Sequence, residues 1–293
     1  MEVLDPGTRP AVPRRSVAAV GRFDGVHLGH RAVLHAVCES ARELGARPAV
    51  VVVDPDMPSP SEGRAGTRIC TLDIKLELLA AEGVEMAVVL AGQHISSLAR
   101  ILDEALGAVL LVSGGGPPDH SATITPVPRV PVRRIPPVRH GDGDAIAAAS
   151  VLGLIARGAV EEAAALLGRP HQVRGVVEHG DARGRTLGFP TANIAVPADV
   201  ALPSDGVYAG QYTGSHGTTY LAAISLGRRP TFYEERGARL LEAHLLDVDA
   251  DLYGDVGSVT FERLLRRQRR FDTVEELVTQ LGIDVDATRG SRR

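Results

Sequence analysis

Between residues 16 and 112 the chain alternates short apolar runs, rich in β-branched residues, with segments of helical periodicity. The apolar runs are SVAAV, PAVVVVD, MAVVLA and AVLLV, and the helical segments are RAVLHAVCESAREL, LDIKLELLAAEG and LARILDEAL. Continuous apolar runs are typical of strands covered on both faces, as in parallel sheets with helical crossovers. The pattern therefore predicts an open α/β domain built from βαβ units.

The second half of the chain has a different sequence pattern. After Pro170, short strand-like runs are separated by Gly, Asp and Asn turns: QVRGVVEHG, TLGFPTANIAV, DGVYAGQYTG, TYLAAISLG, RLLEAHLLDV and GSVTFERLL. Many short strands at this spacing are typical of a closed all-β barrel or a sandwich. The last pattern, TVEELVTQLGI, starts with a Thr cap and glutamates in its first turn, and predicts a helix packed over the β domain.

Two domains also fit the length, because the chain has 293 residues and a domain has about 100–200. Residues 113–143 are rich in Pro and Gly and predict mostly loop. Helical periodicity returns in AIAAASVLGLIARG and VEEAAALLG, which we expect to bridge the halves. We place the domains at residues 1–167 and 168–293.

Composition excludes several classes of function. The chain has 32 Lys and Arg against 36 Asp and Glu, a net charge of −4, which argues against a nucleic-acid binder. It has no secretory apolar segment and no apolar run near the ~20 residues that span a bilayer. Cys38 and Cys70 lack CxxC spacing, so neither a disulfide framework nor a cysteine-based zinc site is expected. We expect a cytoplasmic protein that acts on small molecules, away from membranes.

The first candidate site is the string GRFDGVHLGH at residues 21–30, between the first strand and a helix expected near Arg31. A helix N-terminus supplies free amide donors and a positive dipole end, which attract phosphate. His27 and His30 can add donors, and Gly29 allows a close backbone approach. A second reading is that the two histidines only satisfy the turn.

The second candidate site begins with the string GDARGRTLGFPTAN. Gly180, Gly184 and Gly188 would let backbone amides approach phosphate oxygens. Thr191 and Asn193 are two residues apart and present oxygens on one face of a strand, and magnesium prefers such hard donors. Read alone, the string is also compatible with an ordinary hairpin turn and strand.

Glu242 lies among apolar residues in the strand-like run ARLLEAHLLDV. A carboxylate among apolar residues is expected to have either a charged partner or a catalytic role, because its desolvation is costly. It can pair with an arginine such as Arg239, or it can deprotonate a primary alcohol that attacks a γ-phosphate.

The order and wording of PTAN, LGRRPTF, LEAHLLDVDADLYG and LLRRQRRF resemble the riboflavin kinase module of the bacterial bifunctional riboflavin kinase/FAD synthetase family, over residues 169–286. The resemblance implies a six-stranded flavokinase barrel, with Thr191 and Asn193 at Mg²⁺ and the ATP phosphates. It implies Glu242 as the base toward the riboflavin 5′-hydroxyl. It also implies further contacts to ATP at Gly180, Gly184, Arg185 and Gly188. Contacts to the flavin are implied at Arg266 and Phe271.

The first string resembles the G-x-F-D-G-x-H-x-G-H signature of the nucleotidyltransferase half of the same family. The resemblance implies a Rossmann-like domain of the HxGH type, in which FMN attacks the ATP α-phosphate and pyrophosphate leaves. The protein then supplies positioning and positive charge rather than a nucleophile. The implied nucleotide-binding residues are Gly21, Phe23, Asp24, Gly25, His27, Gly29 and His30.

Three departures from the family pattern lie in the first half. Residues 53–58 carry an acid where T-F-x-P-H-P has its histidine, and SGGGPPDHSA lacks the aromatics of the flavin-contacting loop. The T-x-x-R part of the S-S-T-x-x-R motif falls on residues 149–152, so Leu152 replaces its arginine, and Arg157 would compensate only with a different geometry. Losing such a donor costs about 3–4 kcal/mol by analogy with oxyanion holes.

The sequence thus predicts a riboflavin kinase that uses ATP and Mg²⁺ to make FMN and adenylylates FMN to FAD inefficiently. Two alternatives stay open. One is a fully bifunctional enzyme that makes FAD, and the other is a kinase attached to a non-catalytic module that binds nucleotide or flavin. His179 and His244 are expected to be structural.

Overall fold

The computed structural model describes residues 1–7, 14–54, 67–91, 97–114, 130–141, 143–180, 188–228, 239–248 and 252–291. The chain divides into two compact units, Met1–Val151 and Leu152–Arg293. The boundary that we place at residue 167 stays a prediction. Among the described residues, no helix is long and apolar enough to span a bilayer.

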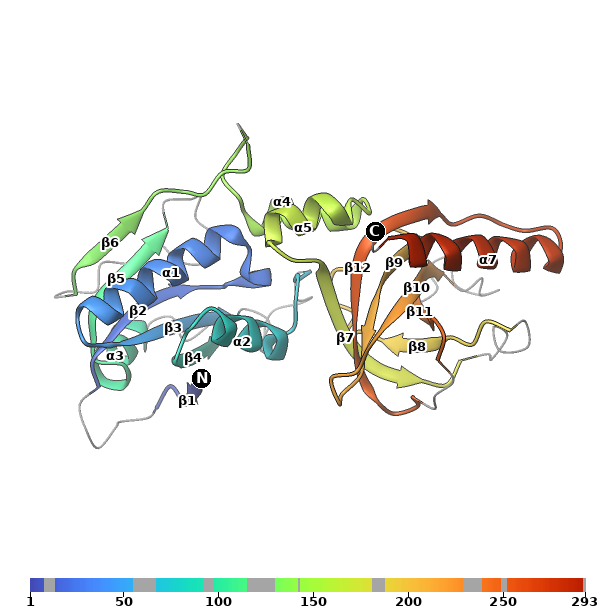
Figure 1. Cartoon of the computed structure of the whole chain (residues 1–293). Coiled ribbons are helices and arrows are strands. Elements are labelled where there is room, and N and C mark those ends of the chain that lie inside the picture. The colour runs from blue at the N-terminus through green and yellow to red at the C-terminus, as the bar shows by residue number, and fades with distance from the viewer. Residues whose placement is uncertain are drawn as a thin grey trace. The chain divides into compact units, whose positions relative to one another are not determined.

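The first unit is built on a six-stranded sheet in the order β1-β4-β3-β2-β5-β6, with every neighbouring pair parallel (Figure 1). Its strands are β1 (Glu2–Leu4), β2 (Ser16–Gly21), β3 (Arg47–Asp54), β4 (Met86–Ala91), β5 (Ala108–Gly114) and β6 (Val132–Ile135). Its helices are η1 (Asp24–Val26), α1 (Leu28–Glu43), α2 (Leu72–Ala81), α3 (Leu98–Arg100) and η3 (Ile101–Ala105), and α4 (Ala148–Ala156) crosses the division between the units. This confirms the predicted α/β class.

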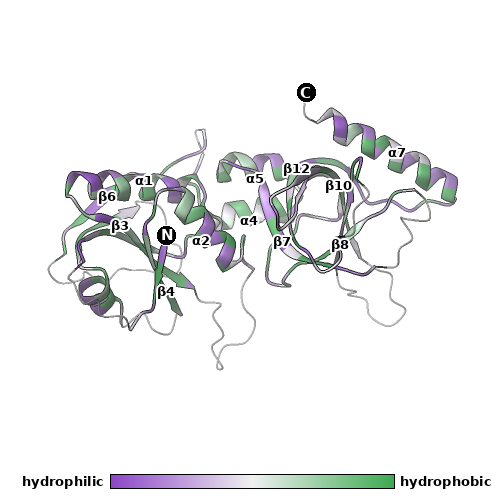
Figure 2. Cartoon of the chain, turned by 60° about the horizontal axis from the view of Figure 1, so that its bottom comes forward, coloured by the Kyte–Doolittle hydropathy of each residue, from purple (hydrophilic) through white to green (hydrophobic). Residues whose placement is uncertain are grey.

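Strand β3 shows why the apolar runs are continuous. Ala49 and Val51 belong to a buried cluster with α3 and η3 on one face of the sheet. Val50 and Val52 belong to a second cluster with α1 and α2 on the other face. Both faces of the strand are therefore covered, and the central strands are correspondingly apolar in Figure 2.

Two strands were not predicted. Strand β1 has only three residues and pairs with β4 at one edge of the sheet, and β6 lies at the other edge, inside the segment predicted to be mostly loop. The side chains of β6 are largely exposed. Edge strands held mainly by backbone pairing leave no hydrophobic pattern, so the prediction of loop was wrong for residues 132–135.

The second unit is a closed barrel of six antiparallel strands in the order β10-β11-β8-β7-β12-β9, which form a ring in Figure 2. The strands are β7 (His171–Glu178), β8 (Ala192–Ala195), β9 (Gly206–Thr213), β10 (Thr219–Arg228), β11 (Arg239–Leu245) and β12 (Val256–Arg267). Helix α5 (Val160–Leu167) contacts β7 and β12, and α7 (Val274–Gly290) contacts β9, β10 and β12. The predicted six-stranded barrel with a C-terminal helix is confirmed.

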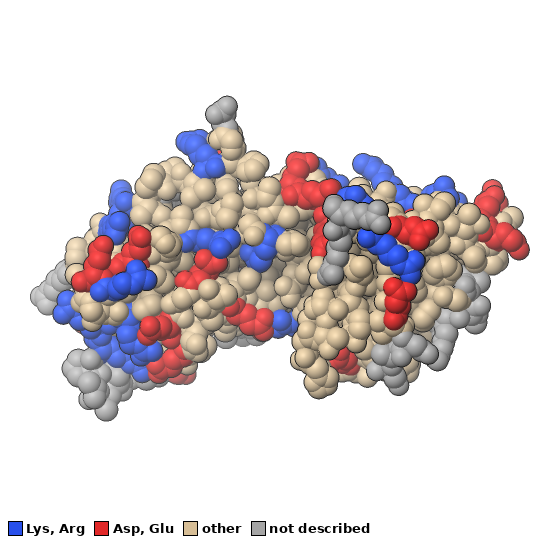
Figure 3. Space-filling model, in the orientation of Figure 1, with Lys and Arg blue, Asp and Glu red and all other residues tan. Residues whose placement is uncertain are grey.

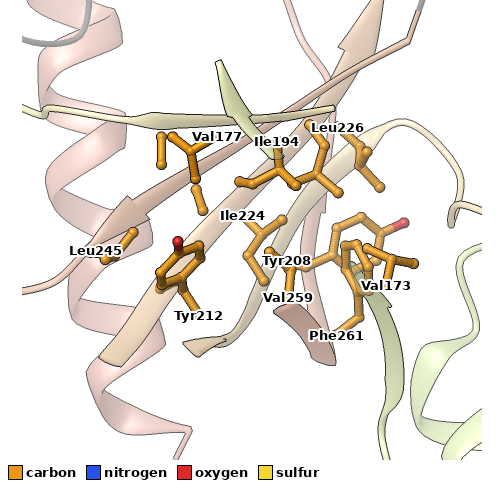
Figure 4. Packing of buried hydrophobic residues seen from close by; sticks show 14 of the residues in the cluster. Val173, Val177, Ile194, Tyr208, Tyr212, Ile224, Leu226, Leu245, Val259 and Phe261 are labelled. Carbon is orange, nitrogen blue, oxygen red and sulfur yellow. The ribbon is translucent and has the colours of Figure 1, made fainter. Parts of the chain in front are cut away.

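The barrel interior is filled by alternate side chains of its strands. Tyr208, Tyr212 and Phe261 are fully buried there, and they interdigitate with aliphatic residues (Figure 4). The Tyr208 hydroxyl donates to the Ser204 carbonyl at 2.7 Å. Because strand residues alternate, the residues between these core positions lie on the outer surface of the barrel.

Helix α7 begins as predicted. The Thr273 side chain accepts from the Glu276 amide at 3.2 Å, which is the expected N-cap. The helix ends at Gly290, later than the predicted pattern.

On the face shown in Figure 3, acidic and basic side chains are interspersed.

The buried His171 makes the barrel sensitive to acid. Its Nε2 lies 2.8 Å from the Ala201 carbonyl oxygen, and burial lowers the pKa of the ring from 6.5 to about 4. Below pH 6.5 the unfolded chain therefore binds a proton that the folded barrel excludes. We expect the barrel to lose on the order of 3 kcal/mol between about pH 6.5 and pH 4, and His171→Gln to remove most of this loss.

Tyrosine fluorescence during urea unfolding measures this effect selectively, because the chain has no Trp and all 5 Tyr lie after residue 207. The exposed His216 provides the matched control, His216→Gln. An unchanged acid sensitivity in His171→Gln would contradict the assignment.

Candidate active sites

The first site lies where β2 ends and α1 begins. Phe23, Gly25 and Val26 all have positive φ, at 50°, 69° and 40°. A Cβ on Gly25 would lie 2.8 Å from the Ile69 side chain, so only glycine fits there. Strained backbone that is held in place by its surroundings is typical of functional turns.

Asp24 has a structural contact in this turn. Its carboxylate accepts from the Ile69 amide at 3.0 and 2.9 Å and from the Cys70 amide at 3.4 Å. Burial raises the pKa of this carboxyl, and the amide hydrogen bonds and nearby Lys75 only partly oppose that effect. The side chain thus joins the turn to the segment that precedes α2.

The two histidines of the string stack on each other, with ring centroids 3.7 Å apart. His27 is the N-cap of α1, and its Nδ1 accepts from the His30 amide at 3.3 Å. Because Nδ1 accepts this hydrogen bond, the N–H group that His27 can offer to a ligand is on Nε2. Burial, followed by the charges of His27 and Lys75, lowers the pKa of His30 well below its usual value. Both rings can therefore donate to phosphate, but His30 brings no fixed positive charge.

Gly29 allows close packing at this turn. A Cβ there would lie 3.0 Å from the His27 ring and 3.3 Å from the Ile146 carbonyl oxygen. The start of α4, at Ala148, follows Ile146 by two residues. Gly21 ends β2 and completes the string.

Sequence reasoning missed a buried ion pair. Lys75 on α2 lies 3.6 Å from the Asp54 carboxylate at the end of β3, and both side chains are 4% exposed. The signal was a lone lysine on the apolar face of LDIKLELL. The acid at the expected histidine position of residues 55–58, and the altered flavin loop from residue 115 on, lie outside the described residues.

Residues 149–152, where the arginine motif is predicted, all lie in the described helix α4. Leu152 lies half-buried in α4. The exposed Arg157 pairs with Glu162 at 2.9 Å, so its guanidinium has a surface partner.

The second site is on the outer surface of the barrel. Ala192 and Ile194 point into the core from β8, and Leu241 and Ala243 do so from β11. Asn193 and Glu242 therefore both lie on the outer face, where they are direct cross-strand partners. Glu178 of β7 pairs with Asn193 on its other side.

The Asn193 side chain is buried and, among the described residues, has an unsatisfied oxygen. It is 8% exposed, and its Oδ1 has no hydrogen-bond partner in the part of the chain that the structure describes. A Cβ on Gly180 would lie 2.0 Å from its Nδ2, so glycine leaves the room that this amide occupies. Thr191 is half-buried two residues before it. A buried orphan oxygen beside a carboxylate-bearing strand fits a hard cation such as Mg²⁺.

Gly180→Ala is expected to raise the KM for ATP with magnesium by about tenfold to a hundredfold, because the new methyl group displaces the Asn193 amide. Steady-state kinetics with ATP at several magnesium concentrations measures this. Gly282→Ala is the matched control, since a Cβ at Gly282 in α7 meets nothing within 4 Å. An unchanged KM would contradict the predicted role of Asn193 in binding ATP and magnesium.

The remaining predicted residues divide into three groups. Gly184 and Arg185 lie outside the described residues. Gly188 is exposed, with a φ of 84°. Arg266 is bound to the buried Asp284 of α7 at 2.8 Å, and Phe271 lies under the Arg266 and Arg269 guanidinium groups at 5.6 and 4.6 Å. Arg266 thus ties β12 to α7, and its flavin contact stays a prediction.

Neighbouring side chains shape this site. His244 Nδ1 lies 2.7 Å from the Pro190 carbonyl oxygen, and His179 stacks on Tyr253 with centroids 3.7 Å apart. The alternative partner of Glu242, Arg239, is bound to Asp205 at 2.8 Å.

The chain combines an α/β unit that has an HxGH turn with a β-barrel in which Asn193 and Glu242 are cross-strand partners, and its two family models make it an ATP-dependent transferase. A family model described as riboflavin kinase matches residues 167–291, and one described as FAD synthetase matches residues 9–102. The chain belongs to the bifunctional riboflavin kinase/FMN adenylyltransferase family.

Individual relatives match nearly the whole chain. The bifunctional riboflavin kinase/FMN adenylyltransferase of Listeria monocytogenes is 35% identical, covering 93% of this chain and 91% of its own. That of Escherichia coli strain K12 is 31% identical, covering 92% and 90%. A crystal structure described as a macrolide-efflux protein from Streptococcus pneumoniae has a TM-score of 0.82 and 28% identity, and covers 99% of both chains.

Proposed function

We propose that the barrel unit transfers the γ-phosphoryl group of ATP to the 5′-hydroxyl of riboflavin, giving FMN and ADP, and that the first unit adenylylates FMN only slowly. The observation that carries the kinase assignment is the outer-face pair of Asn193 and Glu242, with its orphan amide oxygen. The riboflavin kinase family model over residues 167–291 supports the same assignment.

In the proposed reaction, Glu242 accepts the proton of the riboflavin 5′-hydroxyl as that oxygen bonds to the γ-phosphorus and the bond to ADP breaks. Phosphoryl transfer depends mainly on positioning and on charge neutralisation, so a single carboxylate base is sufficient for proton removal. Its location on a strand gives it a fixed direction.

Thr191 and Asn193 would hold the magnesium ion, which when bound neutralises the charge of the β- and γ-phosphates. The amide Oδ1 of Asn193 is already buried and oriented by packing against Gly180. The backbone amides near Gly180 and Gly188 would face the phosphates.

For the first unit, we propose nucleotide binding at the HxGH turn with slow adenylyl transfer. His27 and His30 supply N–H donors, while Leu152 stands where the family motif is predicted to have an arginine. Developing charge on pyrophosphate would therefore lack one cationic contact.

The HxGH turn and the FAD synthetase family model over residues 9–102 favour a second candidate function, a fully bifunctional enzyme that makes FAD. A nucleotide-binding module without turnover is the third. The FMN reaction described in the Discussion separates all three.

The kinase proposal is tested by incubating the full chain with riboflavin, ATP and Mg²⁺ and separating the products by chromatography. FMN and ADP are expected in equal amounts. Absence of FMN at all substrate concentrations would refute the assignment.

A further inference from the structure

A polar row crosses three neighbouring strands on the outer face of the barrel. Glu242 of β11 faces Asn193 of β8 on one side and Ser225 of β10 on the other. Ile224 and Leu226 point into the core, so Ser225 lies on the same outer face as Glu242. Side chains directly opposite each other across strands have Cβ atoms about 4.5–5.5 Å apart, which is within contact for Ser and Glu.

Ser225 is itself held by a residue from a distant part of the chain. The Gln268 side-chain amide donates to Ser225 Oγ at 3.1 Å and to the Leu226 carbonyl oxygen at 3.0 Å. Gln268 follows β12 and precedes α7. A Cβ on Gly227 would lie 3.2 Å from the same amide, so the glycine admits it.

These contacts decide what the Ser225 hydroxyl can do. Its oxygen already accepts from Gln268, so its own hydrogen remains to be donated. The residue in register with Ser225 on the next strand is Glu242, whose carboxylate is able to accept that hydrogen. A hydrogen bond to one carboxylate oxygen fixes the plane of the group and directs the second oxygen.

We propose that Ser225 is a positioning residue for the kinase reaction: it donates its hydroxyl hydrogen to Glu242, with Gln268 setting the direction of that hydroxyl. The inference rests on the proposed function, since it assumes that Glu242 is the base. Ser225 touches neither ATP nor riboflavin in this proposal and acts through Glu242.

The first test is Ser225→Ala in the full chain. We expect kcat for FMN formation to fall about tenfold, a fraction of the ~10²–10⁴ that a whole acid–base group contributes, with the KM for riboflavin and for ATP within about twofold of wild type. Ser225→Thr keeps the hydroxyl and suits a strand, so it should restore most of kcat. Ser258→Ala is the matched control, because Ser258 lies on the outer face of β12 with Arg174 as its partner.

A merely structural role would give a different result. It would lower kcat and the urea midpoint of tyrosine fluorescence together, and threonine would not rescue it selectively. A normal kcat in Ser225→Ala, or a raised KM with unchanged kcat, would overturn the proposal.

The double variant Glu242→Gln/Ser225→Ala separates this inference from the proposed function. If Ser225 acts through Glu242, removing the hydroxyl costs nothing further once the carboxylate is gone, so the two effects are not additive. Additive losses would overturn the positioning role while leaving Glu242 as the base. A fully active Glu242→Gln single variant would instead refute the proposed base.

Discussion

Glu242→Gln is expected to lower kcat for FMN formation by about 10²–10⁴-fold, the range for loss of a general base. The amide keeps the shape of the side chain but cannot take the proton of the riboflavin 5′-hydroxyl. Since Glu242 lies half-buried on the outer face of β11, opposite Asn193, the barrel core is untouched by the change. Tyrosine fluorescence should therefore show an unaltered urea midpoint.

The matched control is Glu262→Gln. Glu262 is also half-buried on a barrel strand, where it accepts from Gln211. Its variant should keep near-normal turnover and KM values. Single-turnover measurements of FMN with saturating ATP isolate the chemical step from product release. A Glu242→Gln enzyme within threefold of wild type would show that another group, or water, removes the proton.

The β class of the second unit could be predicted from its short strands and turn residues, and the six-stranded barrel from the family resemblance. Strands β7 and β11 also alternate between buried and more exposed residues. In β11 the residues Leu241, Ala243 and Leu245 are core positions, and Glu242 falls between them. The sequence pattern does not show which residues of two paired strands face each other, because this register depends on pairing between distant segments. Ser225 therefore carried no signal of its own, although it faces Glu242 directly.

The first unit shows a different limit. The HxGH turn was recognisable from its string, and the structure places His27 at the N-cap of α1. The structural contact of Asp24 could not be recognised from the sequence, because its partners are the backbone amides of Ile69 and Cys70, 45 and 46 residues away. Backbone partners leave no side-chain pattern, so such contacts are found only in the fold.

With FMN, ATP and Mg²⁺ as substrates, FAD formation is expected to be at least about 10²-fold slower than FMN formation from riboflavin. Removing one donor to a developing anion costs about 10²–10³ in rate, and Leu152 stands where the sequence analysis predicts the arginine of the family motif. Arg157, which directly follows α4, is paired with Glu162. Chromatography of both reactions with one preparation measures the ratio.

The variants His30→Ala and Leu152→Arg test whether any FAD formation depends on the HxGH turn and on the predicted motif position. His30→Ala should abolish FAD formation and leave FMN formation unchanged, because the kinase residues lie in the other unit. Leu152→Arg should raise FAD formation, since it returns a cation to the motif position. FAD formed as fast as FMN would establish the fully bifunctional enzyme and overturn the slow-transfer proposal. Nucleotide binding that His30→Ala removes, with no FAD under any condition, would identify a binding module, because affinity for the ground state alone does not accelerate adenylyl transfer.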